Sequence, residues 1–288
     1  MSPKHCWSDL AELCFLRIIM AKVLINFANG FFVKSQQLNT RTALAVGGFD
    51  KAISYTPKDI DRRFYRDNRR ILSRVKGAGY WLWKPYFICK TLKTLREDDF
   101  LFYCDAGSYF IDSIDALVET ARRTGQDIIP FDVGFIEKSY TKRDAFRLMG
   151  CDTPAYTDTA QRLASFILFR NTRFTRDFVA EFLDFARDER ILTDRENELG
   201  YPNYPGFVAH RHDQSIFSLL TKRHRLLAHR DPSQWGNGGE ANYPHSQYGQ
   251  LIEHTRNRNL SVWLKIRELS QAVFSFPQSG IDKPDGDG

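Results

Sequence analysis

The chain has 288 residues, of which 42% are hydrophobic and 14% aromatic, so it can bury a sizeable core and is not a disordered protein. Its 41 Lys and Arg residues outnumber 35 Asp and Glu residues, and the formal net charge of +6 suits anionic ligands. The sequence carries no helix-turn-helix, zinc-finger or ribonucleoprotein signature, which argues against a nucleic-acid partner. Five cysteines without regular spacing indicate neither a disulfide framework nor a thiolate metal site, and favour a reducing, cytoplasmic location.

The first nineteen residues hold an apolar patch, Leu13 to Met20, that Arg17 interrupts and that no small-residue cleavage site follows. We interpret residues 1–19 as an accessory segment, neither a signal peptide nor a membrane span. The main domain is predicted to cover residues 20–258. Its first elements are a strand over 23–27, a helix over 36–46 and a second strand over 51–55.

Further helices and strands alternate along the next segment. Thr56 to Asp59 reads as a helix start, with apolar residues at helical spacing behind it up to Val75. Pro85 opens another helix, the continuous apolar run 100–104 predicts a buried strand, and Asp112 is expected to cap the helix after it. The alternation predicts a single α/β domain of Rossmann type, with a mostly parallel sheet flanked by helices.

The second half of the chain is less regular. Strands are predicted over 127–131 and 165–169, and helices over 141–150, 175–187 and 213–223. Residues 188–203 read as an exposed loop or a frayed helix, and the Gly- and Asn-rich segment 232–248 as a functional lid. Residues 259–276 are predicted to form a C-terminal helix, packed on the domain or resting on an anionic membrane surface, before a disordered tail over 277–288.

Asp105 directly follows the buried strand 100–104, in Asp105-Ala106-Gly107. Open α/β sheets bind ligands beyond the carboxyl ends of their strands, so this carboxylate is well placed to hold a metal ion or a sugar. The alternative is a helix cap or an Asx turn. Lys84 stands at a helix start, where free N–H groups already favour anions, so it is a candidate diphosphate contact or, alternatively, a surface lysine.

Five motifs in this order resemble the GT-A glycosyltransferases of bacterial capsule and lipopolysaccharide synthesis. They are Gly79-Tyr-Trp-Leu-Trp-Lys-Pro85, Tyr103-Cys-Asp-Ala-Gly107, Tyr140-Thr-Lys-Arg-Asp144, His210-Arg-His-Asp-Gln-Ser215 and Glu253-His-Thr-Arg-Asn-Arg258. The resemblance implies transfer of a sugar from a nucleotide-diphosphate donor to a glycan or lipid-linked glycan acceptor. It also implies a location at the inner face of the membrane, with peripheral membrane contact.

The resemblance also assigns residues to the donor side. The nucleotide-sugar contacts are expected to be Phe27, Asn29, Trp83, Lys84, Asp105, Gly107, Asp144, Arg256 and Arg258. Mn²⁺ or Mg²⁺ is the expected cofactor, with Asp105 and His254 as its ligands. The metal motif of such enzymes is usually Asp-x-Asp, and Gly107 occupies its third position here, which weakens the metal prediction.

On the acceptor side, the resemblance makes Asp213 and Gln214 the catalytic pair and His212 an acceptor contact. Asp213 is expected to act as general base if the reaction inverts, or as a transient partner of the sugar if it retains. The alternative for Asp213 is a helix N-cap. Two other functions stay open: a non-catalytic polyanion- or glycan-binding scaffold, and a metal-dependent nucleotidyltransferase.

Overall fold

The structure is a computed structural model that describes residues 20–255. The predictions for residues 1–19, for Arg256 and Arg258, and for the C-terminal helix and tail lie outside the described residues. Within residues 20–255, no helix combines the length and the apolar character that a membrane span requires.

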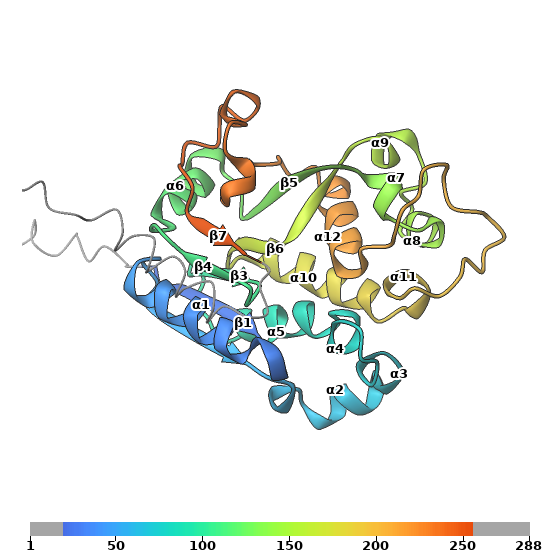
Figure 1. Ribbon diagram of the computed structural model, residues 1–288, viewed down its shortest axis with the longest axis horizontal. Coiled ribbons are helices and arrows are strands. Elements are labelled where there is room, and N and C mark those ends of the chain that lie inside the picture. The colour runs from blue at the N-terminus through green and yellow to red at the C-terminus, as the bar shows by residue number, and fades with distance from the viewer. Residues whose placement is uncertain (1–19, 256–288) are drawn as a thin grey trace, which may run out of the picture.

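A five-stranded sheet forms the centre of the fold (Figure 1). Its strand order is β2 (Lys51–Tyr55), β1 (Lys22–Phe27), β3 (Phe100–Cys104), β6 (Ala160–Arg170) and β5 (Ile128–Ile136). The strand β1 pairs in parallel with β2 and β3, whereas β6 is antiparallel to both β3 and β5. The predicted α/β class with a mostly parallel sheet is therefore confirmed. A second, two-stranded sheet pairs β4 (Ser108–Phe110) with β7 (Ile252–His254).

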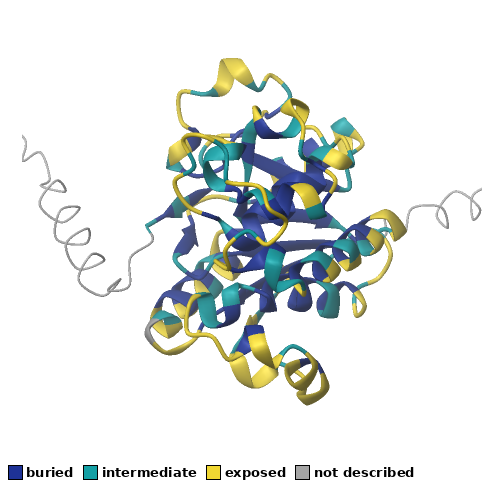
Figure 2. Cartoon of the chain, turned by 90° about the vertical axis from the view of Figure 1, so that its right-hand side faces the viewer, coloured by how far each residue is buried: buried dark blue, intermediate teal, exposed yellow. Residues whose placement is uncertain are grey.

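Side chains alternate between two cores because successive residues of a strand point to opposite faces. In β1, Val23 and Ile25 enter the core beneath α5 (Trp83–Leu92), α10 (Arg173–Ala186) and α12 (His212–Arg223), whereas Leu24 enters the other. The helix α10 packs against both α5 and α12. The opposite core holds residues of α6 (Asp115–Thr124) and Ala43 of α1 (Val33–Ala45). Figure 2 shows the buried strands inside and exposed residues on the peripheral loops and helix faces.

The helix predicted to continue from Thr56 is wrong. Asp59 accepts the Thr56 N–H at 2.7 Å as expected, but this closes only a short 3-10 turn, Pro57–Asp59. Two short helices follow, α2 (Arg62–Asp67) and α3 (Arg69–Leu72). The backbone is already extended at Ile60, where ψ is 122°, and Asn68, with a φ of −118°, separates α2 from α3. Val75, expected in the core, is 95% exposed.

The helix α6 begins after Ile114 and not at Asp112, whose carboxylate accepts the neighbouring Ser113 N–H instead. The other short helices are α4 (Gly77–Tyr80), α7 (Glu137–Tyr140), α8 (Arg143–Leu148), α9 (Pro154–Thr157) and α11 (Glu189–Leu192). The last of these lies in the segment 188–203, predicted as an exposed loop or a frayed helix. The segment 232–248 contains two 3-10 turns, Gln234–Gly236 and Glu240–Asn242.

The turn before α5 has an unusual backbone. Five consecutive residues have positive φ: Gly77 (58°), Ala78 (52°), Gly79 (99°), Tyr80 (51°) and Trp81 (61°). A left-handed helical turn costs L-residues energy, so this turn requires support from its surroundings. A Cβ at Gly79 would lie 2.8 Å from Leu72 Cα, so a side chain there would also collide with the neighbouring backbone. The turn leads directly into Trp83 and Lys84.

Candidate active site

An aromatic pair lies at the carboxyl end of the first strand, β1. Phe27 and Trp83 stack with ring centroids 3.9 Å apart, and both are buried. The Trp83 indole N–H donates to the Gly77 carbonyl at 2.9 Å, which fixes the ring to the left-handed turn. Asn29 is exposed just beyond the end of β1. The structure therefore brings two of the predicted nucleotide contacts together at the carboxyl end of the strand.

A buried ion cluster lies at the same edge of the sheet. The Lys84 ammonium is 2.5 Å from Asp213 Oδ2 and 3.6 Å from Asp105 Oδ1, and it donates to the Ala164 carbonyl at 2.9 Å. The Tyr103 hydroxyl donates to Asp105 Oδ1, and the ammonium lies 4.8 Å from the centre of the Tyr103 ring. Three predicted site residues, from α5, the end of β3 and α12, thus meet in one cluster.

The members of the cluster differ in their access to solvent. The side chains of Lys84 and Asp213 are 3% and 7% exposed, whereas that of Asp105 is 32% exposed. Asp105 is therefore the member that a ligand at the sheet edge meets first. Lys84 lies behind Asp105, so the Lys84 ammonium contacts the two carboxylates and does not face the solvent.

Burial and charge set the protonation of the cluster. Burial raises the pKa of Asp213 to about 6, against the lowering effect of the Lys84 ammonium. Burial alone would lower the pKa of Lys84, but Asp105 and Asp213 outweigh it and raise that pKa. The cluster therefore carries one positive and two negative charges when Asp213 is ionised, and is neutral when Asp213 is protonated.

The Gln214 side chain ties α12 to the sheet. Its Oε1 accepts the Ala164 N–H at 3.4 Å, and its Nε2 donates to Gln161 Oε1 at 2.8 Å. Gln161 in turn donates to Glu137 Oε1 at 3.0 Å, and Glu137, fully buried, pairs with Lys222. The amide of Gln214 thus belongs to a buried polar network that holds the start of α12, and with it Asp213, in place.

His212 and Asp144 lie outside the ion cluster. The His212 ring stacks on Trp81 with centroids 5.3 Å apart and bonds through Nδ1 to the Leu192 carbonyl at 2.9 Å, and burial lowers its pKa. Like Trp81, His212 has a positive φ, of 51°. The Asp144 carboxylate accepts the N–H groups of Glu198 at 2.6 Å and Leu199 at 3.4 Å, so it fixes the loop after α11.

Tyr103, Gln161 and Glu137 are the residues of this region that the sequence did not reveal as site residues. Tyr103 belongs to a continuous apolar strand, and nothing in that pattern distinguishes it from its core neighbours. Gln161 and Glu137 are polar residues in or next to strands, which sequence patterns place on the surface. A buried network becomes visible only once its partners are assembled.

Comparisons with known proteins give distant structural similarities. No family model and no curated protein matches the chain. Mouse xyloside xylosyltransferase 1 is 11% identical over 82% of this chain and 97% of its own, with a TM-score of 0.46. The galactosyltransferase LgtC, solved with donor and acceptor sugar analogues, is 10% identical over 89% of this chain and 98% of its own, also at 0.46. The glycosyltransferase GlyE of Streptococcus pneumoniae is 14% identical over 90% of this chain and 65% of its own, at 0.41.

The side chains near Asp105 offer few free ligands for the divalent cation that the sequence resemblance implies. Asp105 and His254 lie on neighbouring segments, because Ser108 of β4 pairs with His254 of β7. However, Lys84 and the Tyr103 hydroxyl already surround Asp105 Oδ1, and the His254 ring packs on Phe166 at 5.0 Å. Among residues 20–255, no three His, Cys, Asp or Glu side chains gather as a metal-binding group. Asp105 and His254 alone do not fit Mn²⁺ or Mg²⁺, because these ions prefer six ligand atoms that are mostly oxygen.

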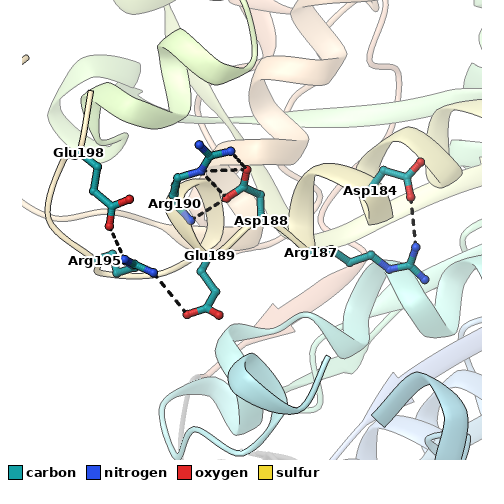
Figure 3. Close-up of a pocket in the computed structure, with 7 residues that line it drawn as sticks. All are labelled: Asp184, Arg187, Asp188, Glu189, Arg190, Arg195 and Glu198. Carbon is teal, nitrogen blue, oxygen red and sulfur yellow. Dashed lines mark hydrogen bonds and ion pairs between the residues drawn. The ribbon is translucent and has the colours of Figure 1, made fainter. Parts of the chain in front are cut away.

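A hollow of about 490 Å³ opens on another part of the surface (Figure 3). It is lined by Asp184, Arg187, Asp188, Glu189, Arg190, Arg195 and Glu198. Its arginines already pair with carboxylates: Arg190 with Asp188, Arg187 with Asp184 and Arg195 with Glu198. The carboxylates of this hollow balance its arginines, so it holds no surplus of positive charge that would favour a phosphate.

Proposed function

We propose that the chain is a glycosyltransferase that moves a sugar from a nucleotide-diphosphate donor to a glycan acceptor in surface polysaccharide synthesis. The observation that carries this proposal is the buried cluster of Lys84, Asp105 and Asp213 at the carboxyl edge of the sheet. This edge is where open α/β folds bind their ligands, and a buried carboxylate with a raised pKa, such as that of Asp213, is typical of functional sites. The sequence motifs around all three residues point to the same class.

The proposed reaction assigns the proton of the acceptor hydroxyl to Asp213. The acceptor oxygen bonds to the anomeric carbon, the bond from that carbon to the diphosphate breaks, and its electron pair leaves with the diphosphate. With a pKa of about 6, Asp213 is ionised at neutral pH and still basic enough to accept a proton. If the reaction retains configuration, the same carboxylate would instead partner the anomeric carbon. Lys84 and Gln214 are positioning residues in either case.

Donor contacts are proposed along the ends of the first and third strands. Phe27 and Trp83 form an apolar wall, and Asn29 and Asp105 offer polar atoms beside it. Gly107 leaves room for a ligand to approach the backbone. Arg256 and Arg258 are proposed to contact the phosphates, because they follow His254 closely in the chain. The proposed site omits Asp144, because main-chain N–H groups occupy its carboxylate.

A non-catalytic glycan- or polyanion-binding scaffold is the second candidate. The observation in its favour is Gly107, which stands where a second metal-binding acid is usual. A nucleotidyltransferase would be expected to show a glycine-rich, basic loop directly after its first strand, and Ala28-Asn29-Gly30 provides no basic residue there.

Titration calorimetry with UDP and GDP, with Mn²⁺ and separately with EDTA, tests the donor site. A product assay with the corresponding nucleotide sugars then separates the two candidates. We expect Asp213→Asn to bind nucleotide but to lose about 100-fold or more in turnover, as for the loss of a general base. Asp158→Asn is the matched control, because Asp158 is a half-exposed carboxylate that pairs with Lys138 at 2.8 Å. If neither nucleotide binds below millimolar concentration with Mn²⁺ present, the proposal is overturned.

A further inference from the structure

A cluster of arginines covers the short helices α2 and α3 and the turn that follows them. Residues 61–76 hold seven basic side chains and two acidic ones, so this segment accounts for most of the formal net charge of +6. The helices α2 and α3 lie at the lower edge of the molecule in Figure 1, beside α4. Six of the seven basic residues are exposed arginines, which we call the arginine patch: Arg62, Arg63, Arg66, Arg69, Arg70 and Arg74.

Most of these guanidinium groups have no carboxylate partner. Asp67 is shared by Arg63, at 3.7 Å, and Arg66, at 3.1 Å. The other acid of the segment, Asp61, pairs with Lys90 at 3.2 Å. Within residues 20–255, no acidic side chain pairs with the remaining four members, Arg62, Arg69, Arg70 and Arg74. The arginine patch therefore carries uncompensated positive charge, which attracts an anionic partner.

The apolar side of the two helices faces the protein interior. Phe64, Ile71 and Leu72 are buried in the core that also contains residues of α5. Tyr65, at 41%, and Val75, at 95%, are the large apolar side chains that residues 61–76 expose. A helix that rests in a membrane surface needs a broad apolar face for insertion, whereas the apolar face of α2 and α3 packs on the domain. The arginine patch therefore suits a partner that is hydrophilic as well as anionic.

The contacts of Asp67 indicate which anion fits this surface. Its carboxylate lies within 4 Å of two members of the patch, Arg63 and Arg66. A guanidinium group is planar, and its N–H donors match the oxygens of a carboxylate. Arg62, Arg66, Arg70 and Arg74 recur every four residues, which is about one helical turn. A chain that carries carboxylates at intervals along its length therefore complements the arginine patch.

The arginine patch leads toward the proposed base. Lys76, the seventh basic residue of the segment, pairs with Asp194 at 2.6 Å, and Asp194 lies 3.7 Å from the His212 ring. His212 immediately precedes Asp213 in α12. In addition, the Lys76 carbonyl accepts the Tyr80 N–H at 2.8 Å, which joins the patch to the left-handed turn before α5. The patch is thus connected through described contacts to both sides of the candidate site.

We propose that the arginine patch binds an acidic glycan, a sugar chain with carboxylate groups along its length, as the extended part of the acceptor. This inference rests on the proposed function, and it specifies the chemistry of the acceptor: the glycan is anionic and several sugar units long. Its reacting end lies at Asp213, and the sugars behind that end pass Lys76 and reach the arginines.

Hexagalacturonic acid is a direct probe of the arginine patch, and maltohexaose is an uncharged chain of the same length. Calorimetry in about 0.15 M salt should show at least tenfold tighter binding of hexagalacturonic acid, with an affinity that falls as salt is raised. Arg70→Gln combined with Arg74→Gln should weaken this binding about tenfold, as expected for two exposed charge contacts. Arg41→Gln combined with Arg225→Gln is the matched control. It removes the same net charge at two exposed positions, on α1 and after α12, and should leave the affinity unchanged.

Three results would overturn the inference. The first is equal binding of the two hexasaccharides, or binding of neither. The second is the same loss of affinity in the control as in the patch variant, which would reflect net charge alone. The third concerns vesicles of phosphatidylglycerol and phosphatidylcholine, which should not bind at this salt concentration. Vesicle binding that the patch variant loses would identify a membrane contact instead.

Two further measurements keep the test decisive. Thermal melting verifies the fold of each variant, and Arg62→Gln combined with Arg69→Gln is a second patch variant should the first fail to fold. Titrating UDP and GDP into the same samples separates this inference from the proposed function. Nucleotide binding without binding of hexagalacturonic acid refutes only the role of the arginine patch, whereas the reverse result refutes the donor site.

Discussion

Replacing Lys84 with methionine removes the ammonium between Asp105 and Asp213 and keeps a side chain of similar length. In the wild-type protein this ammonium lies 2.5 Å from one carboxylate and 3.6 Å from the other, and it is 3% exposed. The variant leaves the buried Asp213 and the partly exposed Asp105 without their shared cation. Breaking a buried ion pair by removing one partner costs about 3–5 kcal/mol, because the remaining charge stays desolvated.

The size of this effect is measurable by thermal unfolding. For a domain of this size, each kcal/mol shifts Tm by roughly 2–4 °C, so Lys84→Met should melt roughly 6–20 °C below the wild type at pH 8. Lys138→Met is the matched control, because Lys138 pairs with Asp158 at 2.8 Å while both side chains are at least 36% exposed. An exposed pair of this kind contributes about 0–1 kcal/mol.

The pH dependence of the Lys84→Met variant provides a second measurement. Without the ammonium, the pKa of Asp213, which burial already raises, should rise further above its value in the unfolded chain. A raised pKa in the folded state stabilises the protein below the unfolded value and loses that contribution as pH rises through the folded value. The deficit of Lys84→Met should therefore shrink from pH 8 to pH 5. A loss of less than about 1 kcal/mol at pH 8, or a deficit independent of pH, would refute this account of the cluster.

Three further predictions follow from the same region. Burial raises the pKa of Asp213 from its ordinary 3.8 to about 6, a shift equivalent to about 3 kcal/mol. Between pH 4 and 7 the wild type should therefore lose about that much unfolding free energy relative to Asp213→Asn, as measured by urea unfolding. The same dependence of unfolding free energy on pH in both proteins would contradict this account. Ala78→Gly should stabilise the protein by about 0.5–1 kcal/mol, because Ala78 has a φ of 52°. Ala180→Gly, on the exposed side of the right-handed helix α10, should destabilise it by about 1 kcal/mol. Calorimetric melting compares the two variants, and stability changes of the same sign would show that the turn is unstrained. In the absence of nucleotide, Lys84→Met should bind Mn²⁺ at least tenfold more tightly than the wild type, because Asp105 and Asp213 then lack a competing cation. Electron paramagnetic resonance measures the affinity for Mn²⁺. An unchanged affinity would mean that the two carboxylates lie too far apart to share an ion.

The local elements of the fold could be predicted from the sequence where one apolar pattern dominates. The run 100–104 gave a buried strand, and apolar spacing in 175–187 gave a helix that ends one residue earlier in the structure. The strands β5 and β6 are longer than predicted. The apolar pattern ended at polar residues such as Gln161, which lies within β6 and is hydrogen-bonded to other buried polar groups. Reading Thr56 as the start of a long helix failed because the backbone becomes extended at Ile60 and leaves helical angles again at Asn68.

The sequence indicated the individual residues of the candidate site but not the contacts between them. Lys84, Asp105 and Asp213 each stood out beside an element boundary, yet their sequence positions do not show that one ammonium contacts both carboxylates. Burial decides that outcome: a lysine at a helix start usually faces solvent, and here the left-handed turn directs it inward. The role of Tyr103 depends in the same way on the position of Asp105 after the strand ends.

The left-handed turn has a consequence for the order in which the protein folds. A run of positive φ that includes Ala78, Tyr80 and Trp81 cannot persist in an isolated fragment, because nothing there repays its strain. Its support comes from distant segments: the Trp81 ring rests on His212, itself left-handed, and the Tyr80 ring lies 5.1 Å from the same imidazole. We therefore expect the turn to reach its final conformation when α12 docks on the sheet. The amino-terminal and carboxy-terminal contributions to the candidate site are then expected to become ordered together.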